Sequence, residues 1–349
     1  MIGMRTGMIE GRQEPQGEME MKMKKTVLCA ALAVLSLLSP AAYAAEEALV
    51  PVGRAVGIVM DVDGVIVEDV TSFRSGEGTV SPAEDAGLMK GDVILALDGE
   101  TVNGTESLNA LLAERDGKTS SLAIRRGGKE LNLKVTPALD AAGGQVRIGV
   151  LATEKISGIG TVTYYDPETG KYGALGHGIH AGKGGCSAIE EGELYDVTLT
   201  GVRRGQHGAA GELHGSIVGE SVGSAEKNTP YGVFGVAEKA LFEGDALPVA
   251  EKEDLHTGRA TILSEVYEGE QAAYEIEITE IADTPDAAKS ISFRVKDKAL
   301  LEKTGGVVRG MSGSPIVQDG HLIGAVTHVL ISDPTEGYGI YIGDMLKAA

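Results

Sequence analysis

The chain has little cysteine and few aromatic residues. Of its 349 residues, two are cysteine, four are phenylalanine and none is tryptophan. Cys29 lies in a predicted signal segment, so Cys186 is the one cysteine of the expected mature chain, which excludes an intramolecular disulfide. Cys186 also lacks the surroundings of a catalytic thiolate, because it follows a glycine-rich stretch with no helix start or second base signalled nearby.

Long helical heptads and long-period repeats are also missing, which argues against helix bundles and solenoids. Glycine, by contrast, is abundant at 50 residues, about twice its usual share. With so few aromatic residues, the core must be built from Val, Ile, Leu and Ala in short strands joined by tight turns. The predicted fold class is therefore mainly β.

Basic residues are outnumbered, with 31 Lys and Arg against 51 Asp and Glu and a net charge of −20. Residues 1–44 hold five basic and four acidic residues, so the chain without them carries 26 against 47, a charge of −21. Nucleic acid is not expected as a partner of such a chain. The charge disfavours adhesion to anionic lipid and makes a basic or neutral substrate segment easier to approach than an acidic one.

The most informative segment is Gly310-Met311-Ser312-Gly313-Ser314-Pro315. Glycine on either side of a serine lets the backbone turn tightly, so that the N–H groups of Gly310 and Ser312 can point at one spot beside the Ser312 hydroxyl. This pattern predicts a serine nucleophile with an oxyanion hole. A plain surface turn is the alternative, since small residues of this kind often form one.

A serine nucleophile needs a base within hydrogen-bond reach and a third group that orients the base. His177 lies between two glycines, after the strand predicted over 158–165 and the turn over 166–170. This places its ring on an accessible corner and makes it the candidate base. A turn or packing histidine is the alternative interpretation.

Two parts of the chain, 158–178 and 304–339, resemble the SpoIVB peptidase family of endospore-forming bacteria. The matching motifs are Gly-Ile-Gly-Thr, Tyr-Gly-Ala-Leu-Gly-His, Leu-Leu-Glu-Lys-Thr-Gly-Gly, Gly-Met-Ser-Gly-Ser-Pro-Ile and Gly-Ala-Val-Thr-His-Val, in the family's order. The resemblance implies a serine endopeptidase with a chymotrypsin-like double β-barrel and a triad of His177, Asp297 and Ser312.

The residues around Asp297 give no independent sign of this role, because flanking lysines are typical of a solvated strand. Its distance from Ser312 in sequence is also shorter than in ordinary chymotrypsin-type chains. Four other aspartates compete for the orienting position: Asp196, Asp245, Asp283 and Asp286.

Residues 81–99 resemble a PDZ domain of the kind found with bacterial proteases. The segment predicts a short helix with Ala86 and Leu88 facing inward, a strand over 93–97 and a turn at Asp98-Gly99. Residues 105–115 then form a predicted helix flanking a peptide groove. The candidate carboxylate-binding loop comprises Ala55, Val56, Gly57 and Ile58. A degraded PDZ domain that binds no peptide is the alternative.

Neither a metal nor a cofactor is expected. Residues 61–64 open like a calcium loop, but the twelfth position is Ser72 rather than glutamate. Residues 182–184 lack the leading glycine and the Ser or Thr of a phosphate loop. His180 is three residues after His177 but has no further ligand signalled nearby, and His328 fits a strand core better than a substrate contact.

The beginning of the chain resembles an export signal. Lys22, Lys24 and Lys25 precede an apolar run over 26–38, and Ala42-Tyr43-Ala44 offers a cleavage site. Cleavage after Ala44 is expected, with retention as an N-terminal anchor as the alternative, and Met21 or Met23 is a candidate start. The expected mature protein is therefore exported across the cytoplasmic membrane.

These features divide the chain into the signal segment (1–44), a PDZ domain (53–137), a linker (138–145) and a peptidase domain (146–349). Resemblance implies a sporulation protease in the space between mother cell and forespore membranes. It would cleave itself and a membrane-bound regulator, and thereby trigger sigma-factor processing, with peptides or C-terminal tails bound at the PDZ groove. The alternatives are a non-catalytic PDZ-barrel scaffold and a general quality-control protease of the cell envelope.

Overall fold

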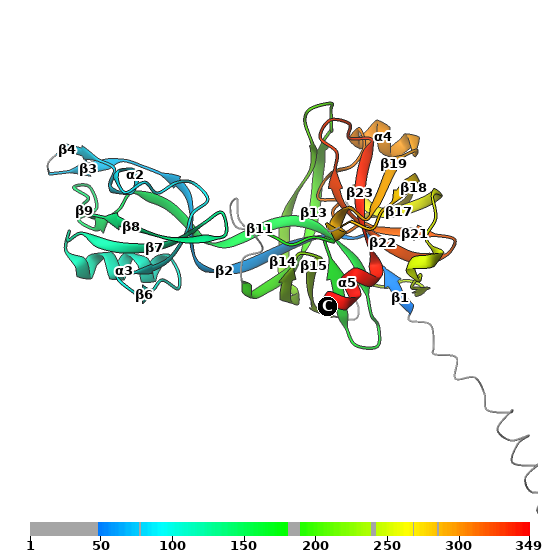
Figure 1. Ribbon diagram of the computed structural model, residues 1–349, viewed down its shortest axis with the longest axis horizontal. Coiled ribbons are helices and arrows are strands. Elements are labelled where there is room, and N and C mark those ends of the chain that lie inside the picture. The colour runs from blue at the N-terminus through cyan, green and yellow to red at the C-terminus, as the bar shows by residue number, and fades with distance from the viewer. Residues whose placement is uncertain (1–47, 77, 181–188, 239–241, 268, 285) are drawn as a thin grey trace, which may run out of the picture. The chain divides into compact units, whose positions relative to one another are not determined.

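The computed structural model describes residues 48–349 apart from 77, 181–188, 239–241, 268 and 285. The predicted signal segment, Cys186 and the stretch 182–184 lie outside the described residues. The described part is mainly β, as predicted, with its strands shown as arrows in Figure 1. In this part of the chain no helix is both long enough and apolar enough to cross a membrane.

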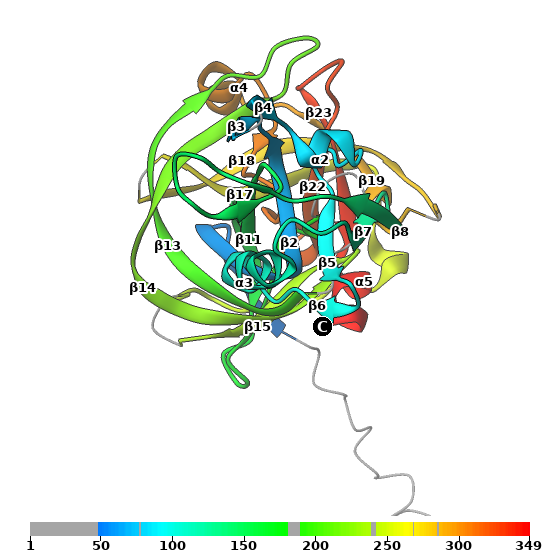
Figure 2. The same ribbon diagram turned by 90° about the vertical axis from the view of Figure 1, so that its left-hand side faces the viewer.

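One group of six strands forms a ring, called barrel 1 here. The pairing runs from β2 through β11, β12, β15, β14 and β13 and returns to β2. The bounds are β2 Ala55–Val70, β11 Val150–Tyr165, β12 Lys171–Ala174, β13 Ile189–Arg203, β14 Gly211–Thr229 and β15 Gly232–Ala237. Figure 2 shows β13 and β14 curving side by side around one flank. Strand β1 (Ala48–Pro51) adds to β11, and β16 (Leu247–Pro248) adds to β1.

A second group of six strands closes into barrel 2, in the order β17, β18, β19, β23, β22, β21. The bounds are β17 Gly258–Tyr267, β18 Glu270–Ile281, β19 Ile291–Val295, β21 Pro315–Gln318, β22 His321–Val329 and β23 Glu336–Tyr341. The short elements beside them are η2 Lys252–Asp254, η3 Ala287–Lys289, α4 Lys298–Thr304, β20 Val308–Arg309 and α5 Ile342–Ala348. Two six-stranded barrels confirm the predicted double-barrel fold.

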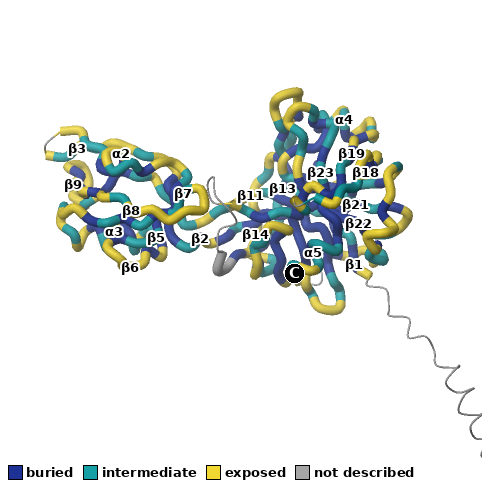
Figure 3. The backbone as a smooth tube through the Cα atoms, in the orientation of Figure 1, coloured by how far each residue is buried: buried dark blue, intermediate teal, exposed yellow. Residues whose placement is uncertain are grey.

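The barrels are filled by aliphatic side chains and a few aromatic rings, as the composition predicted. Inside barrel 2, Ile262, Ile276, Ile316 and Ile340 are fully buried, and Phe293 lies among them. In the tube of Figure 3, buried backbone follows the barrel strands, while the connecting loops are exposed. Burying such side chains stabilises the fold by roughly 1.5–3 kcal/mol each.

A buried carboxylate links the two barrels. Glu265 of β17 accepts a hydrogen bond from the Ala55 N–H at the start of β2, at 3.0 Å, and another from the Gly269 N–H, at 2.9 Å. The Glu265 N–H in turn donates to the carbonyl of Gly53 at 2.9 Å. Because a buried carboxylate is costly unless it is hydrogen-bonded, these contacts fix the start of β2 against barrel 2.

In sequence, the PDZ domain lies between β2, the first strand of barrel 1, and β11, the next. Its elements are β3 Phe73–Ser75, β4 Gly78–Val80, α2 Pro82–Asp85, β5 Val93–Leu97, β6 Glu100–Thr101, α3 Thr105–Arg115, β7 Ser120–Arg126, β8 Lys129–Val135, β9 Ala138–Leu139 and β10 Val146–Arg147. The predicted strand over 93–97 and helix over 105–115 are confirmed. Leu88, Leu108 and Leu112 are buried in its core.

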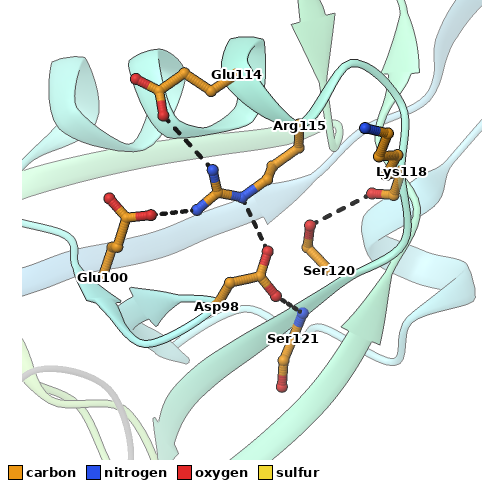
Figure 4. A network of polar contacts seen from close by, with 7 residues as sticks. All are labelled: Asp98, Glu100, Glu114, Arg115, Lys118, Ser120 and Ser121. Carbon is orange, nitrogen blue, oxygen red and sulfur yellow. Dashed lines mark hydrogen bonds and ion pairs between the residues drawn. The ribbon is translucent and has the colours of Figure 1, made fainter.

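A polar network fixes the end of α3 to the turn that follows β5 (Figure 4). The Arg115 guanidinium donates to Asp98 at 2.9 Å and to Glu100 at 2.5 Å. Asp98 also accepts the Ser121 N–H at 2.7 Å, and this bond is the main reason that the pKa of its carboxyl lies below the ordinary value. Asp98 and Gly99 both have positive φ, of 50° and 84°, which confirms the predicted turn at this position.

The predicted PDZ carboxylate loop is wrong. Residues 55–58 form the first part of β2, where Gly57 faces Ile159 of β11 on one side and Tyr195 of β13 on the other. Ala55, Val56 and Ile58 are each 1% exposed. Their backbone is therefore built into barrel 1 and is not available to a peptide carboxylate. The later part of β2 pairs with β5 at Val65 and Ile66, so this one strand belongs first to the barrel and then to the PDZ domain.

Candidate active site

A cavity of about 870 Å³ brings together residues from both barrels. Barrel 1 contributes Gly160, Leu175 and His177, while Ser312 and Thr327 come from the barrel 2 side. The structure thus places the candidate nucleophile and the candidate base at one cavity, although 135 positions separate them in the sequence.

His177 follows a sharp corner at the end of β12. Leu175 and Gly176 both have positive φ, of 70° and 67°. Gly176 is needed here, because a Cβ would lie 3.0 Å from Thr327 Cγ2 in a backbone conformation that already disfavours a side chain. The predicted corner is thereby confirmed, and it directs the chain at His177 into the cavity.

The ring of His177 is oriented by a backbone carbonyl. Its Nδ1 lies 3.0 Å from the carbonyl oxygen of Gly178. Since a carbonyl can only accept, Nδ1 must carry the proton when this bond forms, and Nε2 then bears the lone pair. The Gly178 carbonyl therefore selects the tautomer that a general base requires.

The loop that carries Ser312 is fastened to Thr161 of β11. The Thr161 N–H donates to the Ser312 carbonyl at 2.9 Å, and the Thr161 hydroxyl donates to the Gly310 carbonyl at 2.8 Å. Gly313 permits this approach, because a Cβ there would lie 1.9 Å from the Thr161 carbonyl oxygen. Gly313 also donates its N–H to Val326 of β22 at 2.7 Å. The loop is therefore held from both barrels.

The two backbone groups predicted to form the oxyanion hole remain available. Among the residues that the structure describes, none accepts a hydrogen bond from the N–H of Gly310 or from that of Ser312. The neighbouring N–H groups are used, since Met311 donates to the Val308 carbonyl and Gly313 to Val326. Two free donors on either side of a fastened loop are what stabilisation of an oxyanion needs. Their role stays a prediction.

The hydroxyl of Ser312 does not contact His177 in this structure. It donates instead to the carbonyl of Thr327 at 2.8 Å. The His177 ring faces His328 of β22, with ring centroids 5.0 Å apart and planes inclined by 36°. To be deprotonated by His177, the Ser312 hydroxyl must leave Thr327 by rotating about its χ1 bond. Catalytic hydrogen bonds often tighten only when substrate is bound.

Desolvation at the cavity favours the neutral form of both facing histidines, of which His177 is half-buried and His328 is exposed. This desolvation lowers the pKa of His177 below the ordinary 6.5, against the opposing effect of the Gly178 carbonyl. Desolvation also lowers the pKa of His328 to about 4, with further lowering by His177 and Lys289. A neutral His177 is the form that can accept a proton, and a neutral His328 does not repel the imidazolium that results.

The structure places Asp297 away from this cavity. Its side chain caps α4 and accepts the Leu300 N–H at 2.9 Å. Ser292 of β19 aligns with Tyr338 of β23, which aligns with His328 of β22. Asp297 follows Ser292 by five residues, about 16 Å of extended chain. The predicted contact between Asp297 and His177 is therefore not formed, and its part in a triad stays a prediction.

Asp286, one of the competing aspartates, lies closer to the site than Asp297. Its charge acts on His328, and its carboxylate pairs with Lys289 at 2.9 Å. No hydrogen bond or ion pair joins Asp286 to His177 within the described residues, so the structure does not show it in the orienting position either. No group of three or more His, Cys, Asp or Glu side chains capable of holding a metal is formed within the described residues.

Three positioning groups could not be identified from sequence. Thr161 was seen only as part of the Gly-Ile-Gly-Thr motif, and the Gly178 and Thr327 carbonyls carry no side-chain signal at all. All three act through backbone geometry that joins segments far apart in the chain. The sequence around Thr161 does not single it out, because β11 also contains Thr163, whose buried hydroxyl has no hydrogen-bond partner within the described residues.

Comparison with known families agrees with this architecture. Residues 144–346 match the SpoIVB peptidase S55 family, and residues 55–136 match the PDZ domain. The double barrel, the cavity shared by Ser312 and His177 and these matches define a protein of the peptidase class that carries a PDZ domain. Because the peptidase match covers more than half of the sequence, the chain belongs to the SpoIVB peptidase S55 family.

Individual relatives share shorter segments. A segment of 57 residues in this chain is 37% identical to Serine protease HTRA1 of Xenopus tropicalis, and it covers 16% of this chain and 12% of that protein. A segment of 75 residues is 35% identical to the putative zinc metalloprotease mll0638 of Mesorhizobium japonicum, and it covers 20% of this chain and 20% of that protein. The chain thus spans a fifth or less of the length of these two relatives.

Among solved structures, the Rv3671c protease from M. tuberculosis is similar in both its active and its inactive form. The active form has 14% identity and a TM-score of 0.35, covering 55% of this chain and 72% of that one. The inactive form also has 14% identity, with a TM-score of 0.34, covering 54% and 81%.

Proposed function

We propose that this endopeptidase works by acyl transfer from Ser312, with His177 as its general base. The observation that carries the proposal is the cavity shared by Ser312 and His177 at the meeting of two barrels. Ser312 rotates away from Thr327 and passes its proton to Nε2 of His177 while its oxygen attacks a peptide carbonyl. The N–H groups of Gly310 and Ser312 then stabilise the tetrahedral oxyanion.

The second half of the reaction uses the same groups in reverse. The His177 imidazolium gives its proton to the departing amine, and the peptide bond breaks to leave an ester on Ser312. His177 then takes a proton from water, which attacks the ester, and the imidazolium returns that proton to the Ser312 oxygen as the acid product is released. Throughout, the Gly178 carbonyl keeps the Nδ1 proton in place. The contact between the Gly178 carbonyl and Nδ1 supports catalysis by two side chains, Ser312 and His177, with the backbone orienting the histidine.

In the cell, we infer that the protein is a sporulation signalling protease. Membership of the SpoIVB family supports this role. The enzyme is exported between the mother cell and forespore membranes, cleaves itself, and cleaves a membrane-bound regulator so that a sigma factor is processed. Its signal segment is removed after Ala44 or serves as an anchor. The PDZ domain holds a protein tail or peptide, either to restrain the enzyme or to deliver its target.

Self-cleavage of the purified chain tests the enzymatic part of this proposal. The protein beginning at residue 45 and its Ser312→Ala variant are incubated side by side, and fragments are mapped by mass spectrometry. Fragments from the unaltered protein alone support hydrolysis by Ser312. Identical behaviour of the two proteins contradicts it and favours the non-catalytic scaffold, for which the bond between Ser312 and Thr327 is the one specific observation.

Complementation of a spore-forming host tests the biological part. A strain without its own copy receives the intact gene or the gene with Ser312→Ala. Restored sigma-factor processing with the intact gene alone supports the signalling role. Processing in neither strain, together with retained hydrolysis in vitro, contradicts that role while leaving the enzyme assignment in place.

A further inference from the structure

The cavity at Ser312 has an unusual charge for so acidic a protein. About half of its lining residues are aliphatic, including Ile156, Ile159 and Val329. Among the described lining residues there is no aspartate, glutamate or lysine, and Arg309 is the one arginine. The whole chain carries a net charge of −20, so the cavity presents a local positive charge against an acidic background.

Arg309 lies in the chain directly before the predicted oxyanion hole. It ends β20, immediately before Gly310 and three residues before Ser312. The residue before it, Val308, is 1% exposed, whereas Arg309 is exposed. Alternate residues of a strand face opposite sides, so β20 buries Val308 and presents Arg309 to the solvent side.

No acid within the described residues forms an ion pair with Arg309. Its neighbour across the parallel pairing of β20 and β14 is Glu212, but Glu212 pairs with Arg203 at 2.9 Å. Other exposed arginines of the peptidase do have partners, such as Arg259 with Glu275 at 3.0 Å. An exposed arginine without an acid partner beside a predicted nucleophile has its guanidinium available to a substrate.

We propose that Arg309 is a specificity residue that binds an aspartate or glutamate of the substrate close to the bond that is cleaved. This inference rests on the proposed function, because it requires a peptide carbonyl at Gly310 and Ser312. The guanidinium forms a planar, two-point contact with a carboxylate. The aliphatic part of the cavity accepts the apolar neighbours. The substrate segment is therefore acidic at one position and apolar beside it.

This local preference runs against the overall charge of the enzyme. The net charge repels acidic segments, so binding of such a segment depends on Arg309 to a greater extent than it would in a neutral protein. Lysine could not replace the contact fully, because an ammonium group offers no fork of parallel donors. The proposal thus predicts a graded series in which arginine is better than lysine and lysine is better than glutamine.

Matched peptides measure this preference directly. A set of fluorescence-quenched decapeptides rich in Val, Ile and Ala carries Asp at each position in turn, and a second set carries Asn there. The enzyme beginning at residue 45 is compared with Arg309→Gln, Arg309→Lys and Arg309→Glu. Arg259→Gln is the matched control, because Arg259 is exposed on the outer surface of barrel 2. Thermal melting verifies that each variant is folded.

The expected result is an Asp peptide cleaved about tenfold faster in kcat/KM than its Asn partner, the size of one charge-assisted hydrogen bond. Arg309→Gln abolishes this ratio, Arg309→Lys retains part of it and Arg309→Glu reverses it, so that the Asn peptide is cleaved faster than the Asp peptide. Arg259→Gln leaves it unchanged.

Each contrary outcome has a distinct meaning. Cleavage that depends on Ser312 but shows no preference for Asp overturns the inference and leaves the proposed function standing. A preference that survives in Arg309→Gln also overturns the inference, since another group must then read the acid. Absence of any cleavage that depends on Ser312 overturns the proposed function and this inference with it.

Discussion

The hydroxyl of Thr161 donates a hydrogen bond to the carbonyl of Gly310 at 2.8 Å. This contact joins a strand of barrel 1 to the loop that holds the nucleophile, and it fixes the peptide unit that follows Gly310. The Thr161 backbone makes a second contact two residues further on, at the Ser312 carbonyl. Thr161 therefore makes two of the contacts that hold the loop carrying the predicted oxyanion hole.

Thr161→Val tests the hydroxyl contact with little change of shape. The variant removes the donor to the part-buried Gly310 carbonyl, so we expect the loop to shift. A shift of about 1 Å at a reacting centre can cost on the order of 100-fold in rate. We expect kcat to fall by about 10- to 100-fold, with a smaller change in KM.

Thr161→Ser is the matched control, because it retains the hydroxyl. Steady-state kinetics on a cleavable peptide, with thermal melting alongside, compares the two variants. Equal activity of Thr161→Val and the unaltered enzyme would show that the bond to Gly310 has no part in catalysis.

Asp297 offers a test that separates a structural role from a catalytic one. Asparagine caps a helix about as well as aspartate, whereas alanine costs about 1 kcal/mol of stability. The structure predicts that Asp297→Ala is destabilised and that Asp297→Asn is not, as measured by chemical denaturation.

The activity of Asp297→Asn follows from the orientation of His177. Because the Gly178 carbonyl holds Nδ1, we expect this variant to lose much less activity than His177→Ala does. A loss as large as that of His177→Ala would instead show that the carboxylate reaches the histidine in the working enzyme.

His328 predicts a pH dependence of stability. Its pKa is lowered to about 4 in the folded protein, and its ordinary value is 6.5. The unfolded chain therefore binds the proton more readily, so the free energy of unfolding is fully retained above pH 6.5 and falls as the pH drops toward 4. His328→Gln should lose less stability than the unaltered protein between pH 7 and pH 4.5, as measured by thermal melting.

His256 provides a control of opposite sign. The Thr257 carbonyl and then Asp319 raise its pKa, so its contribution is present at low pH and is lost as the pH rises through the folded value. His256→Gln should therefore remove stability at pH 5 rather than restore it. The account of His328 fails if both glutamine variants respond to acid in the same direction.

Local features of this fold were accessible from sequence, and long-range pairing was not. The turn at Asp98-Gly99, the helix over 105–115 and the corner before His177 are set by glycine and by periodicity within a few residues. Residues 55–58 were misassigned because the role of a strand depends on its partners. Those partners, β11 and β13, lie about 100 residues or more further along the chain.

The candidate site shows the same difference between local features, which the sequence indicates, and long-range contacts, which it does not. Ser312 and His177 were identified because a nucleophile loop and a glycine-flanked histidine have local signatures. Thr161 was missed because its function depends on contact with Gly310, across 149 positions. At Asp297 a local signal was present, since an aspartate before an apolar helical stretch is typical of an N-cap.

Covalent labelling tests the central claim, that His177 activates Ser312. A fluorophosphonate reacts with a serine oxygen only when a neighbouring base removes the proton. We predict that the unaltered protein is labelled at Ser312 in about a 1:1 ratio, as located by mass spectrometry, and that His177→Ala is labelled at least about 100-fold more slowly. Equal labelling of Ser312 in the two proteins, or labelling at another serine, would contradict the account.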